Sequence, residues 1–344
     1  MNKSERNKIL YPDNKNGIYM YEYPEINGIK QYVQIRGTNR NNPLMLFIHG
    51  GPGGAMSGVC HVMQAGWEDK FTVVNWDQRN AGKTYLANKN RAGEIAKTGS
   101  MDDYIKDVDD IITYLHTVYD FKKIIIMGFS WGTAIGSEYA KKRPENVLCC
   151  ISVGQHVNYH DGVLTICRKV LEKTPDSVDE QRIKAIMDGF PEVPLWTPEF
   201  QKRMRFFRPI ALKYLAPHAK ANYTAVIKSP FMNFREKIAS SFPKTKLLEK
   251  SLETMATYDF RKKLNFKVPV QFIFGEEETI CPSDLITECF EHITAPVKEV
   301  VIIPQASHAC VFDNPEEFMK SLTKFLDKLR ASLKTPVQKR RNMI

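Results

Sequence analysis

The sequence predicts an α/β protein whose core is a doubly wound, mostly parallel β-sheet. Short and nearly continuous apolar runs are typical of parallel strands covered on both faces; they occur at residues 44–48, 71–76, 123–127, 147–153, 268–274 and 300–303. Helical patterns separate most of these runs, at residues 101–118, 133–142, 283–292 and 315–333. Strands that alternate with helices indicate a parallel sheet with helices on both faces.

Two further strands are expected before the parallel core. Residues 18–23 and 30–35 alternate between apolar and polar side chains, and Asn27-Gly28 lies between them. Asn-Gly favours a tight hairpin turn. The sequence therefore predicts an antiparallel, half-solvated strand pair at the N-terminal side of the sheet.

The alternation stops between residues 155 and 258, where proline-punctuated helical patterns occur without a buried-strand run. Ligands of such sheets bind at the carboxyl ends of the strands. An insertion after the run at 147–153 can cap that edge. We therefore predict a core domain (residues 1–154 and 259–333), a helical cap (155–258) and a basic, disordered tail (334–344).

Composition restricts the class of protein. The chain has 344 residues, of which 43% are hydrophobic, which is enough for a real core and argues against general disorder. We find no run near the roughly 20 apolar residues that span a bilayer, and no apolar leader. We therefore expect a soluble, cytoplasmic protein without a membrane partner.

The seven cysteines are scattered, odd in number and without a C-x-x-C pair, so we expect reduced thiols and predict neither a metal nor a cofactor. Cys281 and Cys310 lie close in sequence to the candidate site residues described below. A reactive thiol and a buried structural cysteine are both open interpretations for each of them.

The formal charge of +10 raises the question of nucleic-acid binding. Residues 201–250 contain twelve Lys and Arg residues against Glu236 and Glu249. Aromatic residues are interleaved with them, but no nucleic-acid-binding motif is present. Solvated helical faces explain this run more simply, and we predict no nucleic-acid partner.

The chemistry centres on Ser130, which lies in Gly128-Phe129-Ser130-Trp131-Gly132 between a predicted strand and a predicted helix. A sharp strand-to-helix turn exposes the hydroxyl of such a serine. Side chains two residues before and after it would collide, and the two glycines remove them. The pattern predicts a nucleophile.

A serine hydroxyl needs a base, and the base needs an orienting group. His308 follows the last predicted strand, which is where the order Ser, acid, His places the base. Candidate acids follow the strand at 268–274: Glu276, Glu277, Glu278 and Asp284. Asp284 follows Ser283, a candidate N-cap, and is explained by the helix dipole. Three adjacent carboxylates suggest that one of them turns inward toward a cation-forming partner.

A glycine-rich loop at residues 49–54 follows the strand at 44–48 and can form an oxyanion hole. Its glycines let backbone amides approach a substrate, and the residue after the nucleophile supplies a second amide. These amides are those of Gly51 and Trp131. The Lys-Ser/Thr pair of a P-loop is missing, which excludes a phosphate-binding loop of that kind.

These motifs together resemble the proline iminopeptidase branch of the α/β-hydrolase superfamily. In chain order they are His49-Gly50-Gly51-Pro52-Gly53, Asp77-Gln78-Arg79, Gly128-x-Ser130-Trp131-Gly132, Gly275-x-x-Glu278-x-x-x-Pro282 and Ser307-His308. The resemblance covers most of residues 28–330 outside the insertion. It implies the α/β-hydrolase fold, selects Glu278 as the acid, and places His49, Gly50, Gly53 and Asp77 in supporting loops.

Three departures from the family pattern bear on function. Glu278 stands where the family usually has Asp, and Asn80 replaces the first glycine of its Asp-Gln-Arg-Gly-x-Gly-x-Ser motif. The glutamates with which family aminopeptidases hold the substrate ammonium have no matched positions here, and the basic second half of the insertion would repel an ammonium. Acids in its first half could serve: Asp161, Glu172, Asp176, Asp179, Glu180, Asp188, Glu192 and Glu199.

The sequence therefore predicts a serine hydrolase that works through an acyl-enzyme. Ser130 attacks, His308 takes its proton, Glu278 orients the imidazole, and the amides of Gly51 and Trp131 hold the oxyanion. An aminopeptidase acting on a short peptide follows the family motifs, whereas an esterase or other small-molecule hydrolase follows the basic insertion. A transferase that uses the same machinery with another acceptor and a catalytically silent binding protein on the same fold are the remaining interpretations.

Overall fold

The computed structural model describes residues 2–174, 177–188, 190, 194–220, 224–242 and 244–334, with side chains given as far as residue 331. The predicted tail therefore lies almost entirely outside the described residues, as do Asp176 and Glu192 among the candidate acids.

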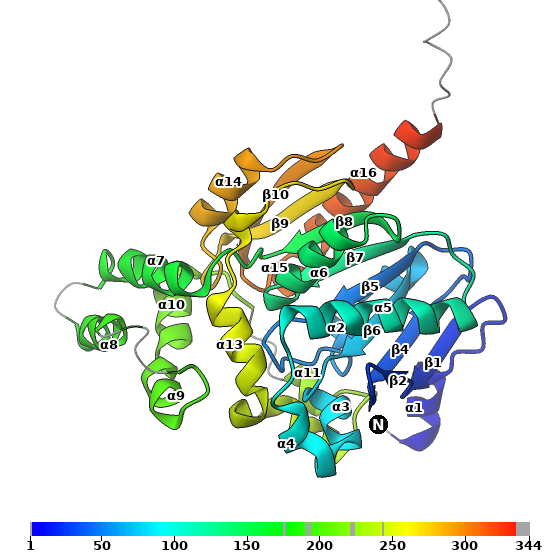
Figure 1. The fold of residues 1–344 in the computed structure, drawn as a ribbon, viewed down its shortest axis with the longest axis horizontal. Coiled ribbons are helices and arrows are strands. Elements are labelled where there is room, and N and C mark those ends of the chain that lie inside the picture. Colours follow the sequence, from blue (N-terminus) through cyan, green and yellow to red (C-terminus); the bar gives the residue numbers. More distant parts are fainter. Residues whose placement is uncertain are drawn as a thin grey trace, which may run out of the picture.

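Within the described residues, eight strands form one sheet in the order β1-β4-β6-β5-β7-β8-β9-β10 (Figure 1). Strand β4 runs antiparallel to both of its neighbours, and the other pairings are parallel. The strands are β1 (Ile18–Glu22), β4 (Tyr32–Gly37), β5 (Leu44–Ile48), β6 (Thr72–Asp77), β7 (Ile124–Phe129), β8 (Val147–Val153), β9 (Val270–Glu277) and β10 (Lys298–Ser307). The predicted mostly parallel sheet is confirmed.

The N-terminal strands differ from the prediction in detail. Asn27 and Gly28, both with positive φ (47° and 76°), form the turn of a separate small hairpin, β2 (Glu25–Ile26) with β3 (Ile29–Lys30). Strand β1 then pairs antiparallel with β4, beyond that hairpin. All six residues of β4 are buried, because Val33 and Ile35 lie in the core on one face of the sheet and Gln34 and Arg36 contact Cys60 and Glu68 on the other, so the expectation that this strand is half-solvated is wrong.

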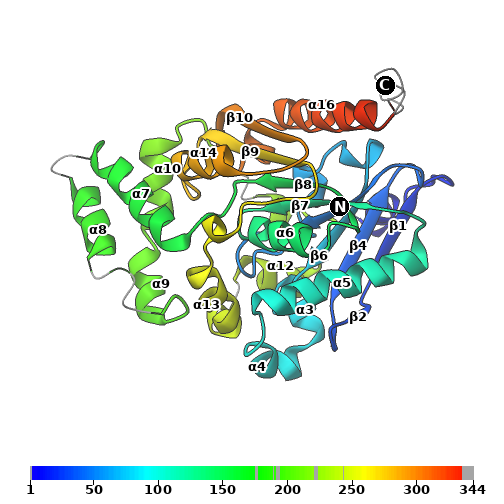
Figure 2. The same cartoon turned by 45° about the horizontal axis from the view of Figure 1, so that its top comes forward.

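Helices cover both faces of the sheet. Figures 1 and 2 place α5 and α6 on one side and α16 on the other. The helices are α1 (Lys3–Leu10), α2 (Cys60–Met63), α3 (Gly82–Ala87), α4 (Ala92–Ile95), α5 (Met101–Val118), α6 (Trp131–Lys142), α7 (Tyr159–Leu171), α8 (Val178–Met187), α9 (Pro198–Met204), α10 (Phe207–Leu215), α11 (Thr224–Ile227), α12 (Phe234–Ser241), α13 (Glu249–Thr257), α14 (Ser283–His292), α15 (Cys310–Asp313) and α16 (Pro315–Lys334). Helix α5 begins where predicted, because the Ser100 side chain accepts the backbone N–H of Asp103.

The continuous apolar strands pack into two cores. Leu46 and Ile126 belong to the core shared with α5 and α6, whereas Met45 and Met127 belong to the core shared with α2 and α16. Successive residues of β5 and β7 thus face opposite cores, which is why these strands do not alternate with polar residues. Strand β10 is the exception, because it lies at the sheet edge and leaves Val300 and Ile302 exposed.

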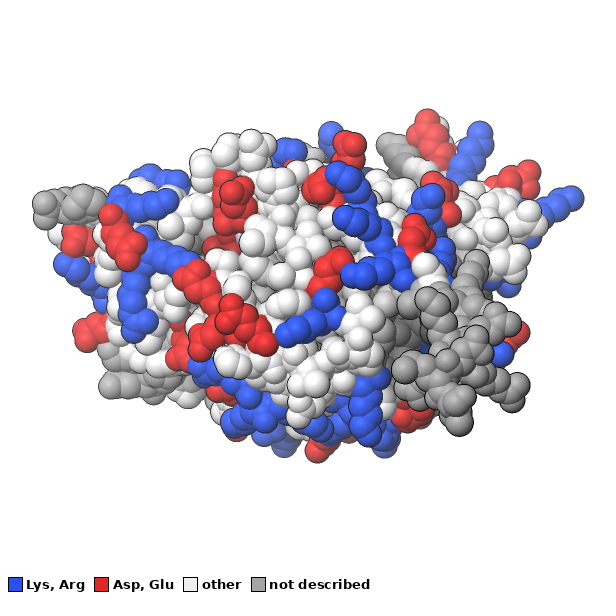
Figure 3. Space-filling model, turned by 90° about the horizontal axis from the view of Figure 1, so that it is seen from above, with Lys and Arg blue, Asp and Glu red and all other residues white. Residues whose placement is uncertain are grey.

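Helices α7 to α13 occupy the described part of the predicted cap, between β8 and β9. Figure 1 shows α7 to α10 beside the sheet, with α13 between them and the core. The twelve basic residues of 201–250 are all exposed or half-buried. On the face seen in Figure 3, acidic and basic side chains are interspersed around an uncharged centre. Among the described helices, none is both long and apolar enough to cross a membrane.

Candidate active site

The turn at Ser130 has the geometry expected of a nucleophile. Ser130 directly follows β7 with φ 53° and ψ −124°, and α6 begins at the next residue. A Cβ on Gly128 would lie 2.4 Å from the Gly132 carbonyl oxygen, and one on Gly132 would lie 2.0 Å from that of Ile48. Only glycine fits at either position, so both glycines are needed for this tight turn.

The chain reverses its direction across the sheet between β5 and β7, since β6 lies on one side of β5 and β7 on the other. Ligands bind at such a switch point, outside the carboxyl ends of the strands. The glycine-rich loop follows β5 there, and Ser130 follows β7. A Cβ on Gly50 would lie 2.8 Å from the Ser130 Cβ. Gly51 and Trp131, the predicted oxyanion residues, line one cavity together with Ser130.

His308 and Glu278 meet at the ends of β10 and β9. The His308 Nδ1 lies 2.8 and 2.9 Å from the two carboxylate oxygens of Glu278. Glu278 Oε1 also accepts the backbone N–H groups of residues 279, 280 and 281, at 2.9, 2.8 and 3.1 Å. Charge-assisted bonds of this kind hold a carboxylate in one orientation. This carboxylate is therefore placed to orient the imidazole.

The other candidate acids point elsewhere. Glu276 accepts the backbone N–H of Gln305, and Glu277 pairs with His218. Asp284 forms an ion pair with Lys169 at 2.7 Å and its side chain is largely exposed. The cap of α14 is Pro282, so the expectation that Ser283 is the N-cap is wrong. Of the four acids, the structure brings Glu278 to His308.

The supporting residues join neighbouring loops. His49 is buried; its Nδ1 lies 2.7 Å from the Gly50 oxygen and its Nε2 accepts the Gln78 N–H at 3.1 Å. Burial lowers the pKa of His49, so the ring is neutral. Asp77 accepts the Lys83 N–H at 2.9 Å. The glycine-rich loop is thereby tied to the loop after β6. Gly53 has φ 84°, and a Cβ there would lie 2.4 Å from Leu248.

Both cysteines near the site are buried. Burial and the Glu278 carboxylate raise the pKa of the Cys281 thiol well above its ordinary value, and the same causes raise the pKa of Cys310. A thiol that stays protonated is a poor nucleophile. Both residues therefore match the structural interpretation. Among the described residues, no cluster of His, Cys, Asp or Glu is placed to hold a metal ion.

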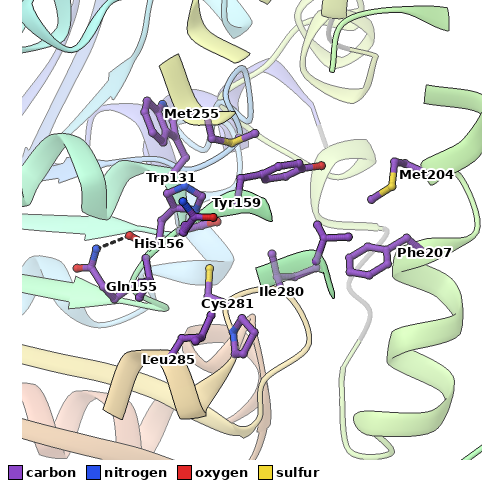
Figure 4. A pocket seen from close by; sticks show the side chains of 16 residues that line it. Trp131, Gln155, His156, Tyr159, Met204, Phe207, Met255, Ile280, Cys281 and Leu285 are labelled. Atoms are coloured by element: carbon purple, nitrogen blue, oxygen red, sulfur yellow. Dashed lines mark hydrogen bonds between the residues drawn. The ribbon is translucent and has the colours of Figure 1, made fainter. Parts of the chain in front are cut away.

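The cavity at Ser130 has a volume of about 230 Å³ and lies between the core and the predicted cap. In Figure 4, Trp131, His156 and Tyr159 lie on one side and Met204 and Phe207 on the other. Its lining residues are Gly51, Ser130, Trp131, Gln155, His156, Val157, Asn158, Tyr159, Val163, Met204, Phe207, Met255, Ile280, Cys281, Pro282 and Leu285. Within the described chain, this lining contains no Asp, Glu, Lys or Arg.

A family comparison matches this architecture. The family model described as serine aminopeptidase, S33, matches residues 40–315, which include Ser130, Glu278 and His308. The chain belongs to the serine aminopeptidase S33 family. The match runs from the strand before the glycine-rich loop to the start of the last helix, and thus includes the insertion.

The relatives found for this chain have low sequence identity to it. It is 25% identical to a probable aminopeptidase, YbaC, of Bacillus subtilis, over 92% of this chain and 98% of that protein. It is also 25% identical to a proline iminopeptidase of Neisseria meningitidis, but over only 49% of this chain and 53% of that protein. The likeness to the second relative thus covers about half of each chain.

Solved structures agree on the α/β-hydrolase fold. A proline iminopeptidase of Mycobacterium smegmatis aligns with a TM-score of 0.62 at 17% identity, over 88% of this chain and 96% of that one. An esterase of Thermogutta terrifontis aligns with a TM-score of 0.54 at 17% identity, over 88% and 94%. The predicted fold and family resemblance are confirmed.

The presence of Asn80, which replaces a glycine of the family motif, has a structural reason. Asn80 has φ 55°, a left-handed conformation that favours glycine and that asparagine also tolerates. Its side-chain amide donates to the carbonyls of Ala92 and Leu247, at 3.2 and 2.7 Å. The substitution therefore keeps the backbone turn and adds a bond to the predicted cap.

Three residues of this site were not predicted from the sequence. Gly154 has φ 62°, and a Cβ there would lie 3.0 Å from the His308 ring and 3.4 Å from Glu278. The Thr133 hydroxyl donates to the Ser130 carbonyl at 2.6 Å and accepts the His156 N–H at 2.8 Å. His156 lines the cavity. The position of Gly154-Gln155-His156 directly after a buried strand was the available signal.

Proposed function

We propose that this protein is a serine hydrolase that acts through an acyl-enzyme on substrates with an uncharged, apolar acyl group. Ser130 attacks the carbonyl carbon while His308 takes the hydroxyl proton. His308 then returns that proton to the leaving group, and water releases the acid by the same route in reverse. The contact between His308 and Glu278 supports this assignment.

Charge develops on the carbonyl oxygen during the attack. The backbone amides of Gly51 and Trp131 are the proposed donors, because both residues border the cavity next to Ser130. Backbone donors that are already in place cost no reorganisation when the oxyanion forms. Glu278 is held by three amides, so it can stabilise an imidazolium without moving.

The observation that carries the substrate class is the lining of the cavity. Its described side chains are largely apolar, and none of them carries a formal charge at neutral pH. A buried ammonium without a partner carboxylate is strongly disfavoured. An uncharged acyl group whose surface is largely alkyl or aryl gains most of its binding free energy there from burial.

The candidate ammonium-binding acids of the predicted cap have other positions. Three of them are in ion pairs, Asp161 with Arg261, Asp179 with Lys213 and Glu180 with Lys184. Glu172, Asp188 and Glu199 are exposed. Of the six acids that the structure describes, none borders the cavity.

An aminopeptidase is the second candidate function. The description of the S33 family and the likeness to YbaC favour it. Aromatic faces at the cavity, such as Trp131 and Tyr159, could attract a cation to a modest degree. They would do so without the hydrogen-bonded counter-charge that a carboxylate supplies.

Three substrates, each of which releases a coloured nitroaromatic product, distinguish these functions. We would compare kcat/KM for a short-chain p-nitrophenyl ester, prolyl p-nitroanilide and N-acetylprolyl p-nitroanilide, with Ser130→Ala as the control. We expect ester hydrolysis that Ser130→Ala abolishes, and no preference for the free amine over its acetylated form.

A free-amine anilide that is cleaved well, together with an acetylated form that is not, would favour the aminopeptidase. Absence of turnover on all three substrates, with no fluorophosphonate labelling of Ser130, would favour a silent binding protein.

A further inference from the structure

Two polar atoms of cavity-lining residues, His156 Nε2 and Trp131 Nε1, are buried without a hydrogen-bond partner among the described residues, and of these only His156 Nε2 can accept. His156 is 7% exposed, lines the cavity beside Ser130 and Trp131, and follows β8 by three residues. Its Nε2 is buried and has no hydrogen-bond partner among the described residues. Buried side-chain nitrogens are nearly always hydrogen-bonded, so an orphaned one on a residue that lines a ligand cavity calls for an explanation.

The protonation state of this ring can be inferred. Burial lowers the pKa of His156 to about 4, so the ring is neutral near pH 7. The Met255 backbone raises that pKa, which is the effect of a carbonyl oxygen near a ring N–H. Since Nε2 has no partner, we assign that proton to Nδ1. Nε2 is therefore a free acceptor.

The ring is held in place relative to the nucleophile. The Thr133 hydroxyl links the Ser130 carbonyl to the His156 backbone N–H, at 2.6 and 2.8 Å. Tyr258 stacks on the imidazole with centroids 6.0 Å apart, and Trp131 meets it edge-on at 5.7 Å. Figure 4 shows His156 next to Trp131 at the cavity. Such an acceptor is pre-organised and need not be ordered when substrate binds.

Two neighbouring polar side chains of the cavity, Gln155 and Asn158, are already hydrogen-bonded within the protein. The Gln155 amide donates to the His156 carbonyl at 2.8 Å, and its oxygen lies 3.4 Å from the Ser137 hydroxyl. The Asn158 oxygen accepts the Asp161 N–H, as the cap of α7. Among these lining groups, His156 Nε2 is a buried acceptor left for a ligand; the Tyr159 hydroxyl at the same cavity can also accept.

We propose that His156 is a specificity residue whose Nε2 accepts a hydrogen bond from an uncharged donor, a hydroxyl or an amide N–H, on the acyl group of the substrate. The inference rests on the proposed function, because it uses the same cavity and nucleophile. An ammonium donor is disfavoured, since the neutral ring and the apolar lining offer it no counter-charge. The substrate class is therefore a hydroxy- or amido-substituted acyl ester or amide.

The test uses pairs of phenyl esters that differ by one isosteric group. 2-Hydroxybutyrate is paired with 2-methylbutyrate, and 3-hydroxybutyrate with 3-methylbutyrate. A 2-aminobutyrate ester adds the ammonium case. We would measure kcat/KM for wild type, His156→Leu and His156→Gln. Dividing the hydroxyl-to-methyl ratio of wild type by that of His156→Leu removes the intrinsic reactivity of each ester.

We expect this quotient to be roughly tenfold or more for at least one pair, because an acceptor left unpaired by a methyl group is costly. His156→Gln, which keeps an acceptor oxygen, should retain part of the preference. Because these variants change a binding residue, their absolute rates can fall for other reasons. The test therefore compares the hydroxyl-to-methyl ratios of kcat/KM. The wild-type ratios, set against the spontaneous hydrolysis of the same esters, remain a test if a variant does not fold.

Each other outcome overturns the inference in a different way. Quotients near one for both pairs, with the methyl esters hydrolysed, would refute the role of His156 and leave the proposed function standing. A preference for the 2-amino ester that His156→Leu removes would make the donor an ammonium. No hydrolysis of any ester by wild type would remove the proposed function and the inference together.

Discussion

Replacing Glu278 with Gln tests the acid assignment most closely. One oxygen of this carboxylate accepts three backbone N–H groups, and His308 Nδ1 lies within 2.9 Å of both oxygens. Glutamine has one oxygen and one NH2 group. The three amides would hold the oxygen at the Oε1 position, 2.8 Å from His308 Nδ1, so the NH2 would take the Oε2 position, 2.9 Å from the same nitrogen, where it would meet the Nδ1–H.

Two donors cannot share that contact. The imidazole would therefore favour the tautomer with its proton on Nε2, and Nε2 could no longer take the Ser130 proton. Loss of the correct tautomer in a triad costs about 10⁴-fold in kcat. That fall corresponds to about 5 kcal/mol of barrier.

The assay is steady-state hydrolysis of a p-nitrophenyl ester, with thermal unfolding to verify the fold of each variant. Asp284→Asn and Glu276→Gln are matched controls that remove one charge from a neighbouring acid. Because the Asp284 ion pair with Lys169 is solvent-exposed, we expect its loss to change kcat by no more than about twofold. A Glu278→Gln variant within tenfold of wild type, or an equal loss in Asp284→Asn, would refute this assignment.

Three further outcomes follow from the structure. Asn80→Ala should lower the free energy of unfolding by about 1–2 kcal/mol more than Asn80→Gly in urea titrations, because φ is 55° there; equal losses would argue against strain. His156 has a lowered pKa of about 4, so the unfolded state binds more protons between pH 6.5 and 4 and stability falls as pH falls. Wild type should lose about 2 kcal/mol more than His156→Gln between pH 7 and pH 5, and parallel pH profiles would contradict a buried neutral ring. Iodoacetamide at pH 8 should leave Cys281 unmodified until the protein unfolds, since its pKa is raised, and rapid native labelling by mass spectrometry would show an accessible thiolate.

The parts of the fold that were predictable from sequence are those with local signals. The strand at 147–153 and the helix at 101–118 have the predicted bounds, because an uninterrupted apolar run and a Ser100 cap mark them. Asn27-Gly28 does form a turn, but β1 pairs with β4 beyond it. Turn chemistry is local, whereas strand pairing depends on distant residues such as those of β6.

The candidate site was likewise predictable only where the sequence carries a local signal. Ser130 and the glycines around it were recognisable because the turn needs them, and the contact of His308 with Glu278 agrees with the motif order. The free acceptor on His156 could not be predicted, since it depends on which buried groups find partners in three dimensions. The lack of a charged residue among the described cavity side chains is likewise a tertiary property.

The central claim is that Ser130 is an activated nucleophile. A fluorophosphonate probe at neutral pH, followed by peptide mass spectrometry, measures this directly on the native protein. We predict one adduct, on the peptide that contains Ser130, which is lost in Ser130→Ala and after heat denaturation. An unlabelled native protein, or an adduct on another residue that persists in Ser130→Ala, would contradict the account.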